Sequence, residues 1–115
     1  MTTPSIAIRH RVRDLNDSFR TSGPGLAGQW RCTAGVQEFG VDFTLLAMRA
    51  VCHFDSFTGD NDPYGEHDFG SFHIGGQHLF WKIDYYDLTL CWPSENPADP
   101  TVTRRVITIM PASEY

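Results

Sequence analysis

The stretch FGSFHIGGQHLFWKIDYY, residues 69–86, decides how the chain folds, because it contains the clearest pair of strands in the sequence. Two runs of alternating apolar and polar residues flank Gly75 and Gly76. Adjacent glycines supply the positive φ angles that a two-residue hairpin turn requires. The sequence therefore predicts a β-hairpin at 69–86 in which Ile74 faces Gln77.

Side-chain alternation along a strand divides this hairpin into two faces. One face is apolar and is predicted to lie in the core: Phe72, Ile74, Leu79, Trp81, Ile83 and Tyr85. The opposite face mixes polar and aromatic side chains: Ser71, His73, His78, Phe80, Lys82, Asp84 and Tyr86. Because this mixture is unusual for a purely solvated surface, we expect a partner surface here, and Phe80 with Tyr86 could form a homodimer contact. The two histidines should lie directly across from each other as ordinary surface neighbours.

A helix is predicted before the hairpin, near the start of the chain. Ile8, Val12, Leu15 and Phe19 recur at helical spacing and define one apolar face, which ends at the glycines and proline of residues 22–25. Three arginines fall on the other faces, and we expect them to form a solvated basic surface: Arg9, Arg13 and Arg20.

The remaining segments complete an α+β pattern. Asp42 is expected to cap a second helix over 43–53, whose apolar face would contain Leu45, Met48 and Cys52, with Leu46 and Ala50 beside it. Strands are predicted at 29–33, 88–92 and 101–110, with Pro111 cutting the last one short. The prediction is one domain over 1–115, in which two helices pack on one face of a mainly antiparallel sheet of four or five strands, with the hairpin at its centre.

An acidic segment, DNDPYGEHDFG at residues 60–70, precedes the hairpin. It holds four carboxylates and a histidine within eleven residues, and no lysine or arginine lies between Arg49 and Lys82. It ends a loop over 54–68 that is longer than most connections in a compact domain, and such loops are usually functional or disordered. The aromatic side chains of this loop argue against disorder.

Charge and composition narrow the possible functions. The net charge is −5, but residues 1–49 carry +2 and residues 50–115 carry −7. The acidic half argues against direct nucleic-acid binding, because phosphate contacts require Lys and Arg. No stretch is long and apolar enough to span a membrane. The three cysteines, an odd number without C-x-x-C spacing, fit a reducing cytoplasm better than a disulfide framework.

Several motifs carry a resemblance to a known family: Leu15-Asn16-Asp17, Phe54-Asp55-Ser56-Phe57, NDPYGEHDFG at 61–70, FWKIDYYD at 80–87, Asp99-Pro100 and Thr108-Ile109-Met110. The chain resembles a bacterial family known as domain of unknown function 3768. The resemblance implies a small protein carried on plasmids and other mobile elements, where antirestriction and plasmid-maintenance genes are frequent neighbours. It implies no reaction.

Three interpretations of the acidic segment follow. In the first, the protein is a non-enzymatic accessory protein of a plasmid or phage that binds a protein, for example an anti-CRISPR or antirestriction inhibitor whose acidic surface occupies a basic nucleic-acid groove of a host defence complex. The partner-binding residues would be carboxylates, aromatic anchors and their polar neighbours: Asp55, Asp60, Asp62, Tyr64, Glu66, His67, Asp68, Phe80, Lys82, Asp84 and Tyr86.

The second interpretation is a metal-dependent hydrolase or nuclease that uses the cluster of Asp62, Glu66, His67 and Asp68. The spacing matches no standard metal motif, so the first interpretation is preferred and no metal, cofactor or catalytic residue is expected. The third is structural: Asn61-Asp62-Pro63 has good turn chemistry, and Glu66 and His67 would tie the loop to the sheet through Lys82 or Asp84.

Overall fold

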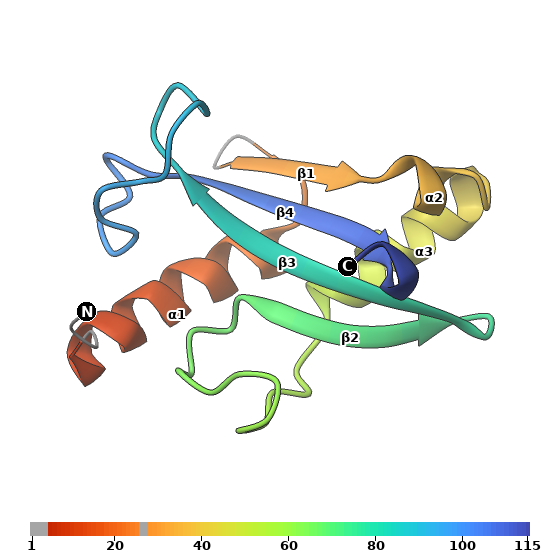
Figure 1. Ribbon diagram of the computed structural model, residues 1–115, viewed down its shortest axis with the longest axis horizontal. Helices are drawn as coiled ribbons and strands as arrows, with labels where there is room; N and C mark the ends of the chain where they lie inside the picture. The colour runs from red at the N-terminus through yellow and green to blue at the C-terminus, as the bar shows by residue number, and fades with distance from the viewer. Residues whose placement is uncertain (1–4, 26–27) are drawn as a thin grey trace.

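The computed structural model describes residues 5–25 and 28–115. Its elements in chain order are α1 (Ile6–Ser22), β1 (Gly28–Cys32), α2 (Ala34–Gln37), α3 (Val41–Cys52), β2 (Phe69–Ile74), β3 (Gln77–Tyr86), β4 (Arg104–Pro111) and the 3-10 helix η1 (Ala112–Glu114). The four strands form one sheet in the order β1-β4-β3-β2 (Figure 1). Only β1 and β4 run parallel, and the other two pairings are antiparallel. The predicted α+β class and the mainly antiparallel sheet are confirmed.

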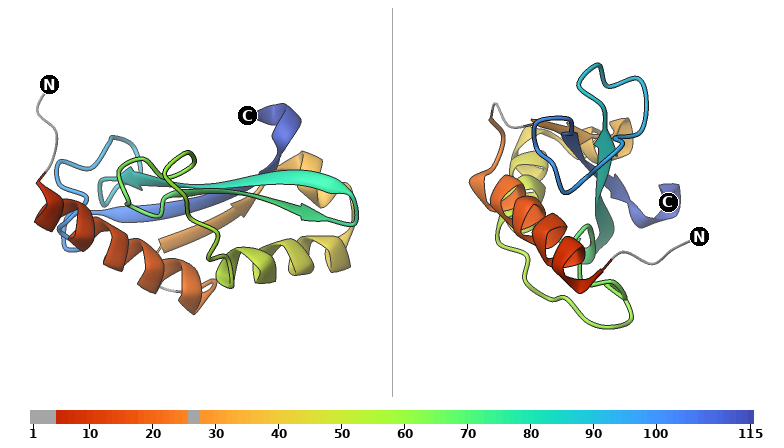
Figure 2. Two further views of the ribbon diagram at one scale, coloured as in Figure 1. Left: turned by 90° about the horizontal axis from the view of Figure 1, so that it is seen from below. Right: turned by 90° about the vertical axis from the view of Figure 1, so that its left-hand side faces the viewer.

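The two long helices lie on one face of the sheet. Figure 2 shows α1 and α3 below the sheet, with η1 on the opposite side. Helices gathered on one face of an antiparallel sheet are typical of α+β domains. The core consists of Phe19 from α1, Val36 from α2, Ala47 and Val51 from α3, and buried residues of β3 and β4.

The hairpin has the predicted register. Ile74 pairs with Gln77 and His73 with His78, and Gly75 and Gly76 have φ angles of 54° and 81°. Its apolar face lies in the core as expected, since Leu79 and Trp81 are fully buried and Ile83 is nearly so. The outer face holds the two histidines, whose rings stack with centroids 4.5 Å apart.

The first helix differs from its prediction on the buried side. Ser5 caps the helix by accepting a hydrogen bond from the Ile8 N–H at 3.2 Å. Ile8 is exposed, whereas Asn16 and Arg20 are buried beside Val12 and Phe19. The expectation of a solvated Arg20 is therefore wrong, because this side chain finds hydrogen-bond acceptors in the interior.

The second predicted helix is rotated relative to its expected face. α3 begins after Gly40 without a side-chain cap, so Asp42 is not the N-cap. Its buried residues are Ala47 and Val51, and Met48 packs against the core as predicted, while Leu45 and Leu46 are 58% and 54% exposed. Ala47 and Val51 thus pack into the core, and the leucines face solvent.

Two strand predictions need correction. Residues 88–92 form turns in which the Asp87 carboxylate accepts hydrogen bonds from Thr89, Cys91 and Trp92, so no strand forms there. β4 begins at Arg104 and not at 101, and Pro111 is its last residue, paired with Leu79. Proline is tolerated here because it ends the strand.

Gly70 offers a test of how tightly the hairpin packs. A Cβ atom at this position would lie against the Trp81 indole and 2.7 Å from Phe54 Cζ. Because overpacking a core costs about 1–3 kcal/mol, Gly70→Ala is expected to lower the free energy of unfolding by about that amount. Gly59→Ala is the matched control, since a Cβ there meets nothing within 4 Å.

Urea denaturation of both variants measures this difference. A loss for Gly70→Ala no larger than that for Gly59→Ala would contradict the packing at the start of β2.

Candidate functional site

A buried asparagine on α1 joins three separate parts of the chain. Asn16 is fully buried, and its side-chain N–H donates to the Glu66 carbonyl at 2.9 Å and to the Tyr85 hydroxyl at 2.8 Å. Its carbonyl oxygen accepts a 2.6 Å hydrogen bond from Arg105 Nε. The acidic loop, β3 and β4 are thus all fixed to one side chain of α1.

Arg105 is the buried cation of this network. It donates a second hydrogen bond to the Pro97 carbonyl at 2.6 Å, and its guanidinium lies 5.2 Å from the Tyr85 ring centroid. Burial lowers the pKa of Arg105, and burial likewise raises the pKa of the Tyr85 hydroxyl. Both shifts follow from the removal of these groups from water. Buried polar groups are unfavourable without hydrogen bonds, and Asn16 supplies one to each of them.

A second buried arginine fastens the start of the acidic loop. Arg20 donates to the main-chain carbonyls of Val51 at 2.9 Å and Phe54 at 2.8 Å, and it forms an ion pair with Asp17 at 3.2 Å. Its guanidinium lies 5.4 Å from the ring centroids of both Phe57 and Trp81. The basic side chains of α1 therefore serve partly as internal anchors for the loop.

His67 is held between two carboxylates. Its Nδ1 lies 2.9 Å from Asp17 Oδ1, and its Nε2 lies 3.6 Å from Asp62 Oδ2. The ring stacks on Phe57 with centroids 3.7 Å apart. His67 also has a φ of 54°, a left-handed conformation that is uncommon outside glycine and that surrounding contacts must hold in place.

The Asp62 carboxylate forms the turn that precedes His67. This nearly buried side chain accepts hydrogen bonds from the main-chain N–H groups of Glu66 at 3.0 Å and His67 at 3.2 Å. Asn61 adds a similar contact by accepting from the Thr58 N–H at 3.0 Å. The structural role predicted for this turn is present, although the partner of His67 is Asp17 and not Lys82 or Asp84.

Glu66 and Asp68 are the two carboxylates of the acidic segment whose pKa values are raised. Burial raises the pKa of Glu66, and the negative charges of Asp68 and Asp62 raise it further. Burial also raises the pKa of Asp68, with Asp62 as the next contribution. Burial and neighbouring negative charge thus both disfavour the ionised forms of these two groups.

The other predicted site residues lie in two different places. Asp55, Asp60 and Tyr64 are exposed on the loop. The rest lie on the outer face of the sheet, where Lys82 and Asp84 form a 2.8 Å ion pair and Tyr86 is half-buried at the end of β3. The predicted residues are therefore divided between the loop and the outer face of the sheet.

Phe80 is less available than its place on the polar face suggested. Its ring lies 5.1 Å from Phe69 and 5.2 Å from Tyr115, measured between centroids. Tyr115 follows η1 and covers this part of the outer face. Phe80, which suggested a partner or a dimer contact, therefore packs against aromatic side chains of its own chain.

Sequence reasoning missed the α1 side of the site, which consists of Asn16, Asp17 and Arg20. Helical periodicity treats polar residues as solvent-facing, so it gave no reason to bury them. The string Leu15-Asn16-Asp17 among the family-like motifs was the one signal that could have identified them.

The geometry gives limited support for a metal centre. Within residues 5–25 and 28–115, no group of three His, Cys, Asp or Glu side chains is placed to hold a metal ion. His67 Nε2 lies 3.6 Å from Asp62 Oδ2, and Nδ1 already faces Asp17.

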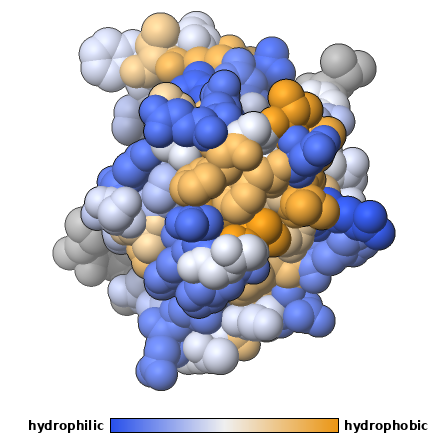
Figure 3. Space-filling model, turned by 90° about the vertical axis from the view of Figure 1, so that its right-hand side faces the viewer, coloured by the Kyte–Doolittle hydropathy of each residue, from blue (hydrophilic) through white to orange (hydrophobic). Residues whose placement is uncertain are grey.

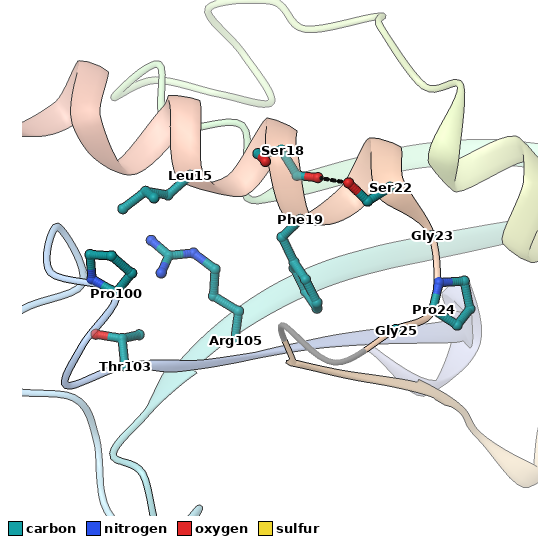
Figure 4. Close-up of a pocket in the computed structure, with 10 residues that line it drawn as sticks. All are labelled: Leu15, Ser18, Phe19, Ser22, Gly23, Pro24, Gly25, Pro100, Thr103 and Arg105. Carbon is teal, nitrogen blue, oxygen red and sulfur yellow. Dashed lines mark hydrogen bonds between the residues drawn. The ribbon is translucent and has the colours of Figure 1, made fainter.

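Two open hollows adjoin this network. One, of about 390 Å³, lies between α1 and the loop and is lined by Ile6, Arg9, His10, Arg13, Asp62, Pro63, Tyr64, Gly65 and His67. The other, of about 250 Å³, lies between α1 and the start of β4 (Figure 4). Arg105 reaches into it from β4, but its guanidinium is already bonded to Asn16 and Pro97.

Fold and site together define a small α+β protein whose α1 helix is bound to an acidic loop by buried polar contacts. A family model described as "Protein of unknown function (DUF3768)" matches residues 32–114, and the chain belongs to this family. The match begins after α1, so Leu15-Asn16-Asp17 lies outside the matched part. Neither a curated protein nor a solved structure matches the chain. Among the described residues, no helix is long and apolar enough to cross a membrane.

Removing the Asn16 side chain tests its role as the buried joint. Asn16→Ala is expected to lower the free energy of unfolding by about 3 kcal/mol or more, because it removes one hydrogen bond to a charged group, worth roughly 1.5–3 kcal/mol, and two to neutral groups, worth roughly 0.5–1.5 kcal/mol each. Ser18→Ala on the exposed side of α1 is the control. Urea denaturation of both variants measures the difference. Similar, small losses of stability for the two variants would contradict this role of Asn16.

The crowded carboxylates predict a specific pH dependence. Because the folded-state pKa values of Glu66 and Asp68 are raised, ionising both groups opposes folding above their folded pKa values. This cost disappears as the pH falls below their ordinary values near 4, where both are protonated whether the chain is folded or unfolded. The double variant Glu66→Gln/Asp68→Asn should therefore have a higher Tm than the wild type at pH 7, and the difference should vanish by about pH 3.5.

Thermal melts from pH 3.5 to 8 measure this difference. Asp55→Asn/Asp60→Asn, which neutralises two exposed acids of the same loop, is the control. An unchanged or lower Tm for Glu66→Gln/Asp68→Asn at pH 7 would refute the proposed crowding.

Proposed function

We propose that this protein is a non-enzymatic accessory protein of a plasmid or phage that acts in the cytoplasm by binding another protein. Its partner would present a basic, nucleic-acid-binding surface, as a restriction or CRISPR nuclease complex does. The contact would be made by the loop at 54–68, with Asp55, Asp60 and Tyr64 at its exposed positions.

The observation that carries the proposal is the crowding of Asp62, Glu66 and Asp68. Burial and the neighbouring negative charges raise the pKa values of Glu66 and Asp68, so the ionised forms of these two groups are costly in the free protein. A cationic partner surface would relieve that cost, so binding would gain from charges that folding does not use. Tyr64, which is 59% exposed on the same loop, offers an aromatic side chain of the kind that anchors protein interfaces.

The environment of His67 favours binding over catalysis. A general base needs a nitrogen directed at the substrate, within hydrogen-bond reach of the proton that it removes. Here one nitrogen is bonded to Asp17 and the other faces Asp62. The imidazole therefore supports the loop conformation, and the loop displays the residues around it.

Charge reversal on the loop tests the proposal. Asp55→Lys/Asp60→Lys should abolish the activity without unfolding the protein, because both side chains are exposed. Glu38→Lys/Glu95→Lys, at exposed positions away from the loop, changes the net charge equally and should leave activity intact. Circular dichroism melts establish that both variants fold.

The readout is the transformation efficiency of a plasmid encoding each variant. Bacterial strains that carry a restriction system or a CRISPR nuclease are compared with otherwise identical strains that lack it. Wild type and control should raise the efficiency by about tenfold or more, and the loop variant should not, because placing like charges against a basic partner costs several kcal/mol. Equal efficiency for all variants across these strains would refute the proposal.

A further inference from the structure

The outward face of α3 is unusually apolar. Val41 is 75% exposed, Leu45 58% and Leu46 54%, and the adjacent Phe39 is 47% exposed. Figure 3 views the molecule from the side where α2 and the first turn of α3 lie, and it shows an apolar area surrounded by hydrophilic residues. Contiguous apolar surface of this kind on a small protein marks an interaction site.

Charge and apolar residues on this face follow a symmetric order. Asp42, Leu45, Leu46 and Arg49 occupy positions i, i+3, i+4 and i+7, so they share one side of the helix, and together they line a shallow surface groove. The midpoint of the set falls between the two leucines. Asp42 precedes that midpoint by as many residues as Arg49 follows it.

We propose that this face binds a second copy of the same chain, with the two α3 helices antiparallel about a two-fold axis between Leu45 and Leu46. In that arrangement Asp42 of each chain lies opposite Arg49 of the other, and the leucines pack against one another across the axis. One surface thus supplies both halves of a self-complementary contact, which is what a two-fold interface requires.

The charges favour this occupant over an unrelated protein. Asp42 and Arg49 lie about 10 Å apart along the helix, given a rise of roughly 1.5 Å per residue, so they cannot pair within one chain. In the described part of the chain, neither has an ion-pair partner. An antiparallel copy satisfies both at once and covers the leucines between them.

The size of the face sets the strength of the dimer. α3 has 12 residues and is about 18 Å long, so one helix buries less than the roughly 800 Å² per partner of a standard interface. We therefore expect a reversible dimer that dissociates on dilution and weakens at high salt, because its charges lie at the rim. This surface is separate from the acidic loop, so each can be altered without the other.

Sedimentation velocity of the full chain over roughly 5–500 µM tests the proposal. The wild type should shift from monomer to dimer across this range. Asp42→Arg alone and Arg49→Asp alone should each weaken the dimer by about tenfold or more, because two attractive pairs become two repulsive ones. Arg104→Asp, at an exposed position on β4, is the matched control and should dimerise as the wild type does.

Mixing the two single variants gives the sharpest result. The Asp42→Arg chain carries a positive charge at both positions, and the Arg49→Asp chain carries a negative charge at both. A mixed dimer therefore restores two attractive pairs, so the mixture should dimerise more strongly than either variant alone. A protein that stays monomeric throughout would refute the proposal. So would a dimer that is insensitive to both reversals, or variants that fail to form a mixed dimer.

Discussion

The hydrogen bond from Arg105 to Asn16 is the contact on which the rest of the structure depends. It places a guanidinium in the interior, where an unpaired charge would be strongly unfavourable, and it satisfies that charge with a neutral side chain from the opposite layer. Because the same asparagine also bonds the Glu66 carbonyl and Tyr85, the position of α1 and the path of the acidic loop are set by one group. Apolar packing holds the layers together, and this contact determines how they are aligned.

The loop consequently has two kinds of residue with different tasks. Asp62 and His67 point inward and hold the main chain in a conformation that includes a positive φ at a histidine. Asp55, Asp60 and Tyr64 point outward and are free to contact a partner. A long loop that is held in one conformation presents its charges in a fixed geometry. The loop then loses less conformational entropy when a partner binds.

The parts of this structure that follow from local pattern were predictable from the sequence. The hairpin at 69–86 and its core face follow from strict alternation around two glycines, and the α+β class follows from the order of the segments.

The predictions that were wrong concern residues whose environment depends on long-range contacts. Periodicity assigns Arg20 and Asn16 to solvent because the carbonyls and the guanidinium that satisfy them belong to residues between 31 and 89 positions away. The face of α3 was mistaken because Ala47 and Val51, which are small, occupy the interior in place of the larger leucines. The loop part of the candidate site was predictable because its charges are clustered in the sequence. The α1 part was not, because nothing in the pattern of α1 distinguishes its buried polar residues from exposed ones.

The pairing of the ends of the chain bears on how the protein folds. β1 and β4 are joined as parallel neighbours, and Asn16 meets Arg105 across 89 positions of sequence. Such distant contacts slow folding, because the loop-closure entropy must be overcome before the contacts form. During synthesis, the β2–β3 hairpin can form from adjacent residues, but one of its edges stays open until β4 leaves the ribosome. The nascent protein therefore passes through a stage in which a strand edge is unpaired and Asn16 still lacks its partner Arg105.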